Sequence, residues 1–334
     1  MRDILSRLSL KDVVRMSILS REWRRLRICH PDLVFTKYTF SYSTTENAEH
    51  PEQMEYDPKK QESLAREFIN NVESVLFPLW SATTSTTTLD RFVIKFGLRR
   101  KHKYCIDRWV SFSTASKAKH IALDFKHNVT CFGSGYDKDK YVVPMWDFNG
   151  PNSSCVKSLE LGYVCLELPP SFCGITYLKK LTLNMVSIKG GDLERLLLSC
   201  ALLESLNIYM CSSSSSLRVP QELSRLQYLR VRYCGMKMIE LNAPNLTKFE
   251  FDDDIVQTLL SESSKLSEAI FVSNLRLVNG YDDVLDDIFT ELPSALPHVH
   301  TLVLLLTAIQ VCSRNKCLIS FCNYAILIFT FRFL

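Results

Sequence analysis

Apolar residues recur along the first part of the chain at steps of three, four and five. This spacing predicts two or three short amphipathic helices with one buried stripe. Ser9 with Asp12 fits a capping box, and Ser20 fits a second helix N-cap. Because about 25 residues cover too little of their own surface, the stripe needs the rest of the chain or a partner to bury it. Its main apolar residues are Ile4, Leu5, Leu8, Leu10, Val13, Val14, Leu19, Trp23 and Leu26.

A second apolar pattern, L-x-x-L-x-L, occupies the middle of the chain. Short strand-like cores begin at residues 159, 181, 206, 229 and 249, which are 20 to 25 residues apart. Earlier cores begin at residues 92 and 121. The interval lies within the period of leucine-rich repeats, about 20–29 residues. Cys211 and Cys234 follow two of the cores at the position where such repeats place Asn or Cys.

The alternation within each core predicts how the repeats pack. The two flanking apolar residues point into the core, and the residue between them points to the opposite face. Each unit buries only one side, so neighbouring units must stack. The pattern predicts an α/β leucine-rich-repeat solenoid, a curved parallel sheet with helices and loops on its convex side, including a helix over 191–200. The outward mid-strand residues are the candidate contacts for a bound target protein. They are Glu160, Thr182, Asn207, Arg230 and Glu250.

The segments between and around these patterns are less regular. Residues 28–60 lose periodicity and predict a loop or linker, whereas 61–79 has one apolar face and predicts a helix that caps the repeats. Residues 128–149 predict an inserted loop. The tail, 312–334, is largely apolar and fits no repeat. It is interpreted as a membrane anchor, an extra core strand or disordered tail, or a gene-model artefact.

Composition narrows the class of protein. The chain has 334 residues, 46% of them hydrophobic, which suffices for a sizeable core. A net charge of +4 does not by itself indicate nucleic-acid binding. The twelve cysteines are scattered without Cys-x-x-Cys spacing, and no apolar signal core precedes them. We therefore expect reduced, packed thiols at Cys211 and Cys234, in the cytoplasm or nucleus.

Catalytic chemistry has little support in the sequence. The glycine pairs lack the following Lys and Ser or Thr of a phosphate-binding loop, and no cluster has metal-ligand spacing. We expect no cofactor and no metal. The basic run from Arg99 to Lys103 is interpreted as a nuclear signal, a phosphate patch or a solvated turn.

The amino-terminal run resembles an F-box, in Ile4-Leu5, Leu8, Leu10-Lys11-Asp12, Ser17, Leu19-Ser20 and Trp23-Arg24-Arg25-Leu26. Together with the repeats, it resembles the plant F-box/leucine-rich-repeat family of FBD type. Further segments that resemble recurring motifs of this family occur at 68–76, 89–92, 107–110 and 196–206. The resemblance covers roughly residues 3–308, with an incomplete first F-box helix and without the C-terminal domain that many members carry.

This resemblance implies domains and a function. The F-box would span 1–35, a linker and capping helix 36–90, the repeats 91–311 and the apolar tail 312–334. The family docks Skp1-like adaptors, and through them cullins, as the substrate-recruiting subunit of an SCF-type ubiquitin ligase. That role is not enzymatic, and it needs neither nucleic acid nor membrane. The alternative is a leucine-rich-repeat binding module, or a truncated product, without a ligase role.

Overall fold

The structure is a computed structural model of the chain. Two compact units, Met1–Ile175 and Thr176–Leu334, divide the molecule. The residues that the structure describes are Asp12 and the ranges 30–40, 58–81, 88–126, 139–149, 155–212, 216–236, 238–253, 257–260, 264–277, 299–310 and 327–332.

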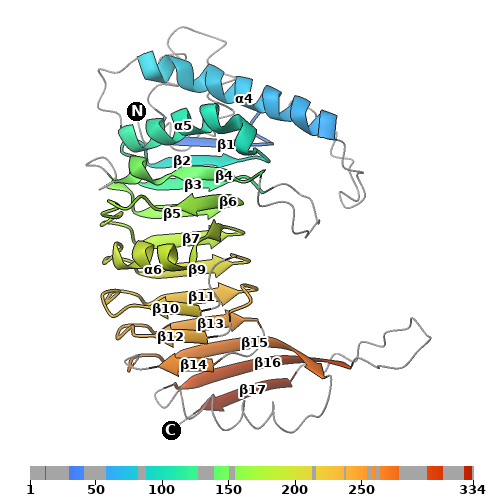
Figure 1. The fold of residues 1–334 in the computed structure, drawn as a ribbon, viewed down its shortest axis with the longest axis vertical. Coiled ribbons are helices and arrows are strands. Elements are labelled where there is room, and N and C mark those ends of the chain that lie inside the picture. Colours follow the sequence, from blue (N-terminus) through green and yellow to red (C-terminus); the bar gives the residue numbers. More distant parts are fainter. Residues whose placement is uncertain are drawn as a thin grey trace, which may run out of the picture. The chain divides into compact units, whose positions relative to one another are not determined.

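The first unit is built on parallel strands (Figure 1). In its described part, β1 (Asp32–Thr36), β2 (Arg91–Lys95), β3 (His120–Asp124) and β5 (Ser158–Gly162) pair in that order. β4 (Tyr141–Pro144) and β6 (Val164–Glu167) form a second parallel pair. Its helices are α4 (Pro58–Ser81), η3 (Arg100–His102), α5 (Lys103–Ala115) and η5 (Met145–Phe148).

Helices α4 and α5 of this unit are joined by aromatic and charged contacts. The Trp109 indole on α5 donates a 2.7 Å hydrogen bond to Glu73 on α4, and Arg108 pairs with the same carboxylate at 3.1 Å. Phe68 of α4 stacks on Phe96, just after β2, with ring centroids 4.3 Å apart. Because Trp109 is fully buried, the helix pair closes the core of this unit rather than lying free in solvent.

The second unit repeats one strand in register. In the described residues, β7 (Lys180–Asn184), β9 (Ser205–Tyr209), β11 (Tyr228–Arg232), β13 (Lys248–Asp252), β15 (Glu268–Leu277) and β16 (Thr301–Gln310) are parallel neighbours, and β17 (Leu327–Arg332) is antiparallel to β16. A smaller parallel sheet contains β10 (Ser216–Val219), β12 (Met238–Leu241) and β14 (Gln257–Leu260). Strand β8 (Ser187–Ile188) and helix α6 (Gly190–Leu198) lie between β7 and β9 in the sequence.

The leucine pattern explains why these strands stack. The two apolar residues of each strand core face inward and are fully buried, as the alternation predicted. The prediction of an α/β leucine-rich-repeat fold is confirmed. The inward residues of β7, β9 and β11 have no exposed surface; they are Leu181, Leu183, Leu206, Ile208, Leu229 and Val231.

A left-handed residue after each of three strands extends the backbone ladder. Met185, Met210 and Tyr233 have φ values of 55°, 49° and 52°. Their amides donate to the carbonyl of the last strand residue in the next repeat, at 2.7, 2.8 and 2.7 Å. The positive φ turns the chain while keeping this donor aimed at its neighbour. Side chains other than glycine tolerate the conformation at a cost of about 1–2 kcal/mol.

The cysteine positions behave as expected. Cys211 is buried, and its thiol donates to the carbonyl of Leu183 in the preceding repeat, with sulfur and oxygen 3.5 Å apart. Cys234 makes the equivalent contact with Ile208 at 3.9 Å. Burial raises the pKa of the Cys234 thiol, which keeps it protonated and able to donate. The prediction of packed thiols is confirmed.

Several elements differ from the sequence predictions. The predicted loop over 28–60 contains β1, and the predicted insertion over 128–149 contains β4 and η5. Helix α4 continues past Pro78 to Ser81, since a proline near a helix end removes only one hydrogen bond. The predicted helix over 191–200 spans Gly190–Leu198. Of the tail alternatives, an extra strand is observed at β17, whereas 312–326 lies outside the described residues.

Candidate protein-binding face

Four of the five predicted target contacts lie side by side in the second unit. Thr182 on β7 pairs in register with Asn207 on β9, Asn207 with Arg230 on β11, and Arg230 with Glu250 on β13. We call these four residues the central row. Each side chain is half-buried, while its neighbours along the strand are fully buried. The strands therefore present the central row on the face opposite the leucine core.

Glu160, the fifth predicted contact, lies on β5 of the first unit. It is in register with Ala122, which is in register with Val93. The Glu160 carboxylate accepts a 2.7 Å hydrogen bond from Lys95. Its neighbours along the row are apolar, and Val93 and Ala122 are only 6% and 7% exposed. The mid-strand positions of β2 and β3, next to Glu160 in this row, are therefore covered and apolar.

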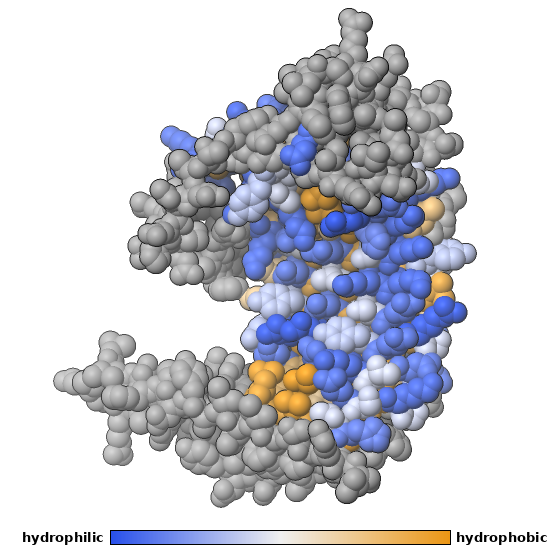
Figure 2. All heavy atoms as spheres, turned by 180° about the vertical axis from the view of Figure 1, so that it is seen from behind, coloured by the Kyte–Doolittle hydropathy of each residue, from blue (hydrophilic) through white to orange (hydrophobic). Residues whose placement is uncertain are grey.

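Charged side chains along the second unit's face neutralise one another. Arg230 lies 3.0 Å from Glu250, and Lys248 lies 3.3 Å from Glu250 and 3.0 Å from Glu268. The hydrogen bond with Glu268 raises the pKa of Lys248. Because the pairs of Arg230 with Glu250 and of Lys248 with Glu268 cross adjacent strands, they hold the outward side chains in fixed positions. Figure 2 shows a face of the molecule on which hydrophilic residues predominate, with rings of intermediate hydropathy among them.

An aromatic and guanidinium cluster borders the central row, and the sequence analysis missed it. The rings of Tyr209 and Tyr233 meet edge to face with centroids 5.7 Å apart. The Arg232 guanidinium lies 5.4 Å from the Tyr233 ring and pairs with Asp252 at 2.7 Å. Burial, followed by the hydrogen bond with Asp252, raises the pKa of Tyr233. Tyrosine and arginine are the residue types that most often dominate protein interfaces.

A positional signal could have found this cluster. Tyr209 and Arg232 occupy the fifth position of their strands, which shares a face with the mid-strand position. Tyr233 comes one residue later, at a positive φ, and its ring contacts that of Tyr209. The sequence prediction covers the mid-strand positions alone and not the two outer rows of the same face.

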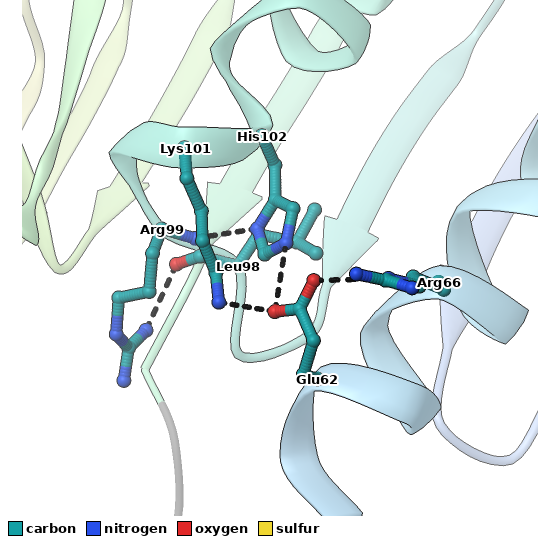
Figure 3. Close-up of polar contacts among 6 residues, drawn as sticks. All are labelled: Glu62, Arg66, Leu98, Arg99, Lys101 and His102. Atoms are coloured by element: carbon teal, nitrogen blue, oxygen red, sulfur yellow. Dashed lines mark hydrogen bonds and ion pairs between the residues drawn. The ribbon is translucent and has the colours of Figure 1, made fainter. Parts of the chain in front are cut away.

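The basic run of the first unit has structural partners. Figure 3 shows Lys101 and His102 of η3 facing Glu62 of α4, whose other carboxylate oxygen accepts a hydrogen bond from Arg66 at 3.1 Å. Nδ1 of His102 accepts a 3.1 Å hydrogen bond from the Arg99 amide, and Nε2 lies 3.7 Å from Glu62. Burial lowers the pKa of His102, and the hydrogen bond from Lys101 lowers that of Glu62. These contacts join α4 to the repeat that follows it.

The candidate adaptor-contact residues lie outside the described residues, in the segment 4–26 of which only Asp12 is described. Their predicted helical stripe therefore stays a prediction. Within the described ranges, no group of three or more His, Cys, Asp or Glu side chains could hold a metal. Nor does any helix there combine the length and the apolar character needed to cross a bilayer.

Comparisons with known proteins agree with the stacked strands. The family model described as At1g61320/AtMIF1, LRR domain, matches residues 84–315, and an F-box domain model matches residues 1–26. The fold and these matches define a leucine-rich-repeat protein with an F-box at its amino-terminal end. The chain belongs to the plant F-box/leucine-rich-repeat family.

Relatives from Arabidopsis thaliana extend the likeness over most of the chain. It is 26% identical over 268 residues to F-box/FBD/LRR-repeat protein At1g13570, covering 79% of this chain and 49% of the relative. It is 26% identical over 300 residues to F-box/LRR-repeat protein 13, covering 84% and 56%. The chain thus spans about half the length of these relatives.

Proposed function

We propose that this chain is a substrate-recruiting F-box subunit of an SCF-type (Skp1–cullin–F-box) E3 ubiquitin ligase, without catalytic activity of its own. One observation carries the proposal: an F-box match at 1–26 and a repeat domain with a polar, half-buried strand face occur in a single chain. The first would bind the ligase and the second the protein to be modified.

The adaptor would bind the apolar stripe of the F-box. A short amphipathic helix gains stability by laying its apolar face into a partner's groove. Central aromatic and aliphatic anchors dominate the energy of such contacts, which favours Trp23 and the leucines. The proposed contacts are Ile4, Leu5, Leu8, Leu10, Val13, Val14, Leu19, Trp23 and Leu26.

The target would bind the central row and the cluster of Tyr209, Arg232 and Tyr233, with Glu160 as a separate contact in the first unit. The mechanism is proximity, because the ligase brings a ubiquitin carrier close to a lysine of the bound target. Charges on the face of the second unit are paired, which favours a protein over nucleic acid. We propose the cytoplasm or nucleus as the compartment.

Co-purification with a Skp1-like adaptor tests the proposal. The wild-type chain should retain the adaptor, whereas Leu8→Asp and Trp23→Ala should each weaken binding by about 30-fold or more, as expected for anchor residues. Thr182→Ala on the central row is the matched control and should retain the adaptor fully. If the wild-type chain fails to bind, the alternative of a repeat-based binding module without a ligase role is favoured.

A further inference from the structure

Polar atoms without a hydrogen bond gather on the face of the second unit. In the part of the chain that the structure describes, two atoms on this face are covered and lack a hydrogen-bond partner. They are Oδ1 of Asn184 and Oδ1 of Asn207. Since folded proteins satisfy nearly all covered polar groups, such a cluster needs an explanation.

The two atoms come from neighbouring positions on adjacent strands. Asn184 is diagonal to Asn207 because it pairs with Tyr209. Diagonal neighbours on adjacent strands lie about 7–8 Å apart. The structure thus places two acceptors side by side on β7 and β9.

The charges around this cluster are already satisfied. Nε of Arg230 lies 3.0 Å from a carboxylate oxygen of Glu250 in an ion pair. Arg232 is paired with Asp252 at 2.7 Å. A charged ligand would have to break these pairs, whereas a neutral ligand would not. The groups left to recognise are therefore the two amide oxygens.

We infer that Asn184 and Asn207 bind the main chain of an extended segment of the target protein. An extended peptide carries N–H donors and C=O acceptors on one edge, repeating every two residues at about 6.6 Å. That repeat is close to the diagonal separation of the two asparagines. Peptide N–H groups would donate to the two Oδ1 atoms.

The side chains have the freedom that this role needs. Asn184 and Asn207 are half-buried rather than buried, and χ2 of asparagine is broadly distributed. A rotation about χ2 exposes Oδ1 to a ligand without moving the strand. Tyr209, which flanks Asn207 on the same strand, would pack against a side chain of the bound segment. The inference rests on the proposed function, because it specifies how the repeat domain holds its target.

Opposite effects on folding and binding distinguish this role from a structural one. Replacing Asn207 by leucine removes an oxygen that the free protein leaves unsatisfied, so stability should stay constant or rise. Binding should fall, because the peptide N–H loses its acceptor. A purely structural asparagine would give lower stability instead. Ser205→Ala on the same strand and face is the control and should change neither property.

The test uses the full chain and a displayed library of random linear peptides. Peptides selected on the wild-type chain should bind Asn184→Leu and Asn207→Leu about tenfold more weakly and Ser205→Ala equally well. N-methylation of single peptide amides should abolish binding at two positions that are two residues apart. The two leucine variants should unfold at unchanged or higher denaturant concentration.

Three results would overturn the inference. They are failure to select any peptide, equal binding by the two asparagine variants, and tolerance of N-methylation at every position. None of them bears on the F-box, since adaptor binding is measured separately with Leu8→Asp and Trp23→Ala. The inference can therefore fail while the proposed ligase role stands, and the reverse also holds.

Discussion

The outward mid-strand positions differ between the two units. In the first unit two of them, Val93 and Ala122, are only 6% and 7% exposed, whereas Val34 and Glu160 are half-buried. In the second unit they hold the polar, half-buried central row of Thr182, Asn207, Arg230 and Glu250. The same leucine alternation builds both, so the inward pattern sets the fold and the outward residues set what each unit can bind. Apart from Glu160, target contacts are accordingly expected in the second unit.

The largest effect should follow removal of an inward leucine. Leu206→Ala should lower the free energy of unfolding by about 2–5 kcal/mol, because the fully buried side chain leaves a cavity between stacked repeats. Asn207→Ala, one residue along and facing outward, should change it by less than about 0.5 kcal/mol. Urea titration followed by circular dichroism measures both variants. Equal losses would contradict the assignment of inward and outward positions.

A lysine introduced at a mid-strand position should destabilise the first unit more than the second. Val93→Lys places an ammonium at a covered position and should cost about 3 kcal/mol or more. Thr182→Lys makes the same change at the corresponding half-exposed position of the second unit and should be close to neutral. The two variants are compared by thermal unfolding. If Val93→Lys is tolerated as well as Thr182→Lys, the mid-strand position of β2 is not covered.

Acid should weaken the contact between α4 and η3 in the first unit. The folded pKa of His102 lies below 6.5 because of burial, so the unfolded chain binds more protons as the pH falls through 6.5, and stability falls. The folded pKa of Glu62 is also lowered, by Lys101 first, so its contribution is lost below about 4.5.

The measurement is the urea midpoint between pH 8 and pH 5. Wild type should lose more stability over this window than His102→Gln, which lacks the titrating group. Arg99, Lys101, Arg66 and Glu62 are the charged groups around His102 and stay unchanged in both proteins. Parallel pH curves for the two proteins would show that His102 remains solvated.

The smallest effect concerns the left-handed turn after β9. Met210 has a φ of 49°, which glycine adopts freely and β-branched residues resist. Met210→Gly should change stability by less than about 1 kcal/mol, whereas Met210→Val should lower it measurably. Thermal unfolding of the pair tests the turn. Equal stabilities would mean that the backbone there is not held at positive φ.

The repeat strands were predictable because each one needs two inward apolar residues to pack on its neighbours. These residues recur in the sequence at a nearly regular interval. The missed elements lack that signal. Strand β1 stands apart from the regular spacing, and strands β4, β10, β12 and β14 have only four residues each. Such short strands gain their stability from pairing between repeats rather than from local sequence, so periodicity does not mark them.

The candidate site was predictable in part. Alternation correctly placed the central row outward, because side-chain direction follows from strand geometry alone. The Tyr209, Arg232 and Tyr233 cluster depends on a turn conformation and on pairing between strands, and neither is visible in a single repeat. The unsatisfied atoms of Asn184 and Asn207 depend on side-chain packing across the sheet. Sequence periodicity therefore identifies the face, and the structure identifies the residues on it.

Quantitative affinity purification from plant cells tests most directly whether the second unit's outward face holds the target. Wild type is compared with a variant carrying Thr182→Lys and Asn207→Lys, with the Skp1-like adaptor as internal reference. The account predicts equal recovery of adaptor and loss of a defined set of other proteins from the variant. Recovery of the same proteins with both chains, at equal adaptor levels, would contradict it.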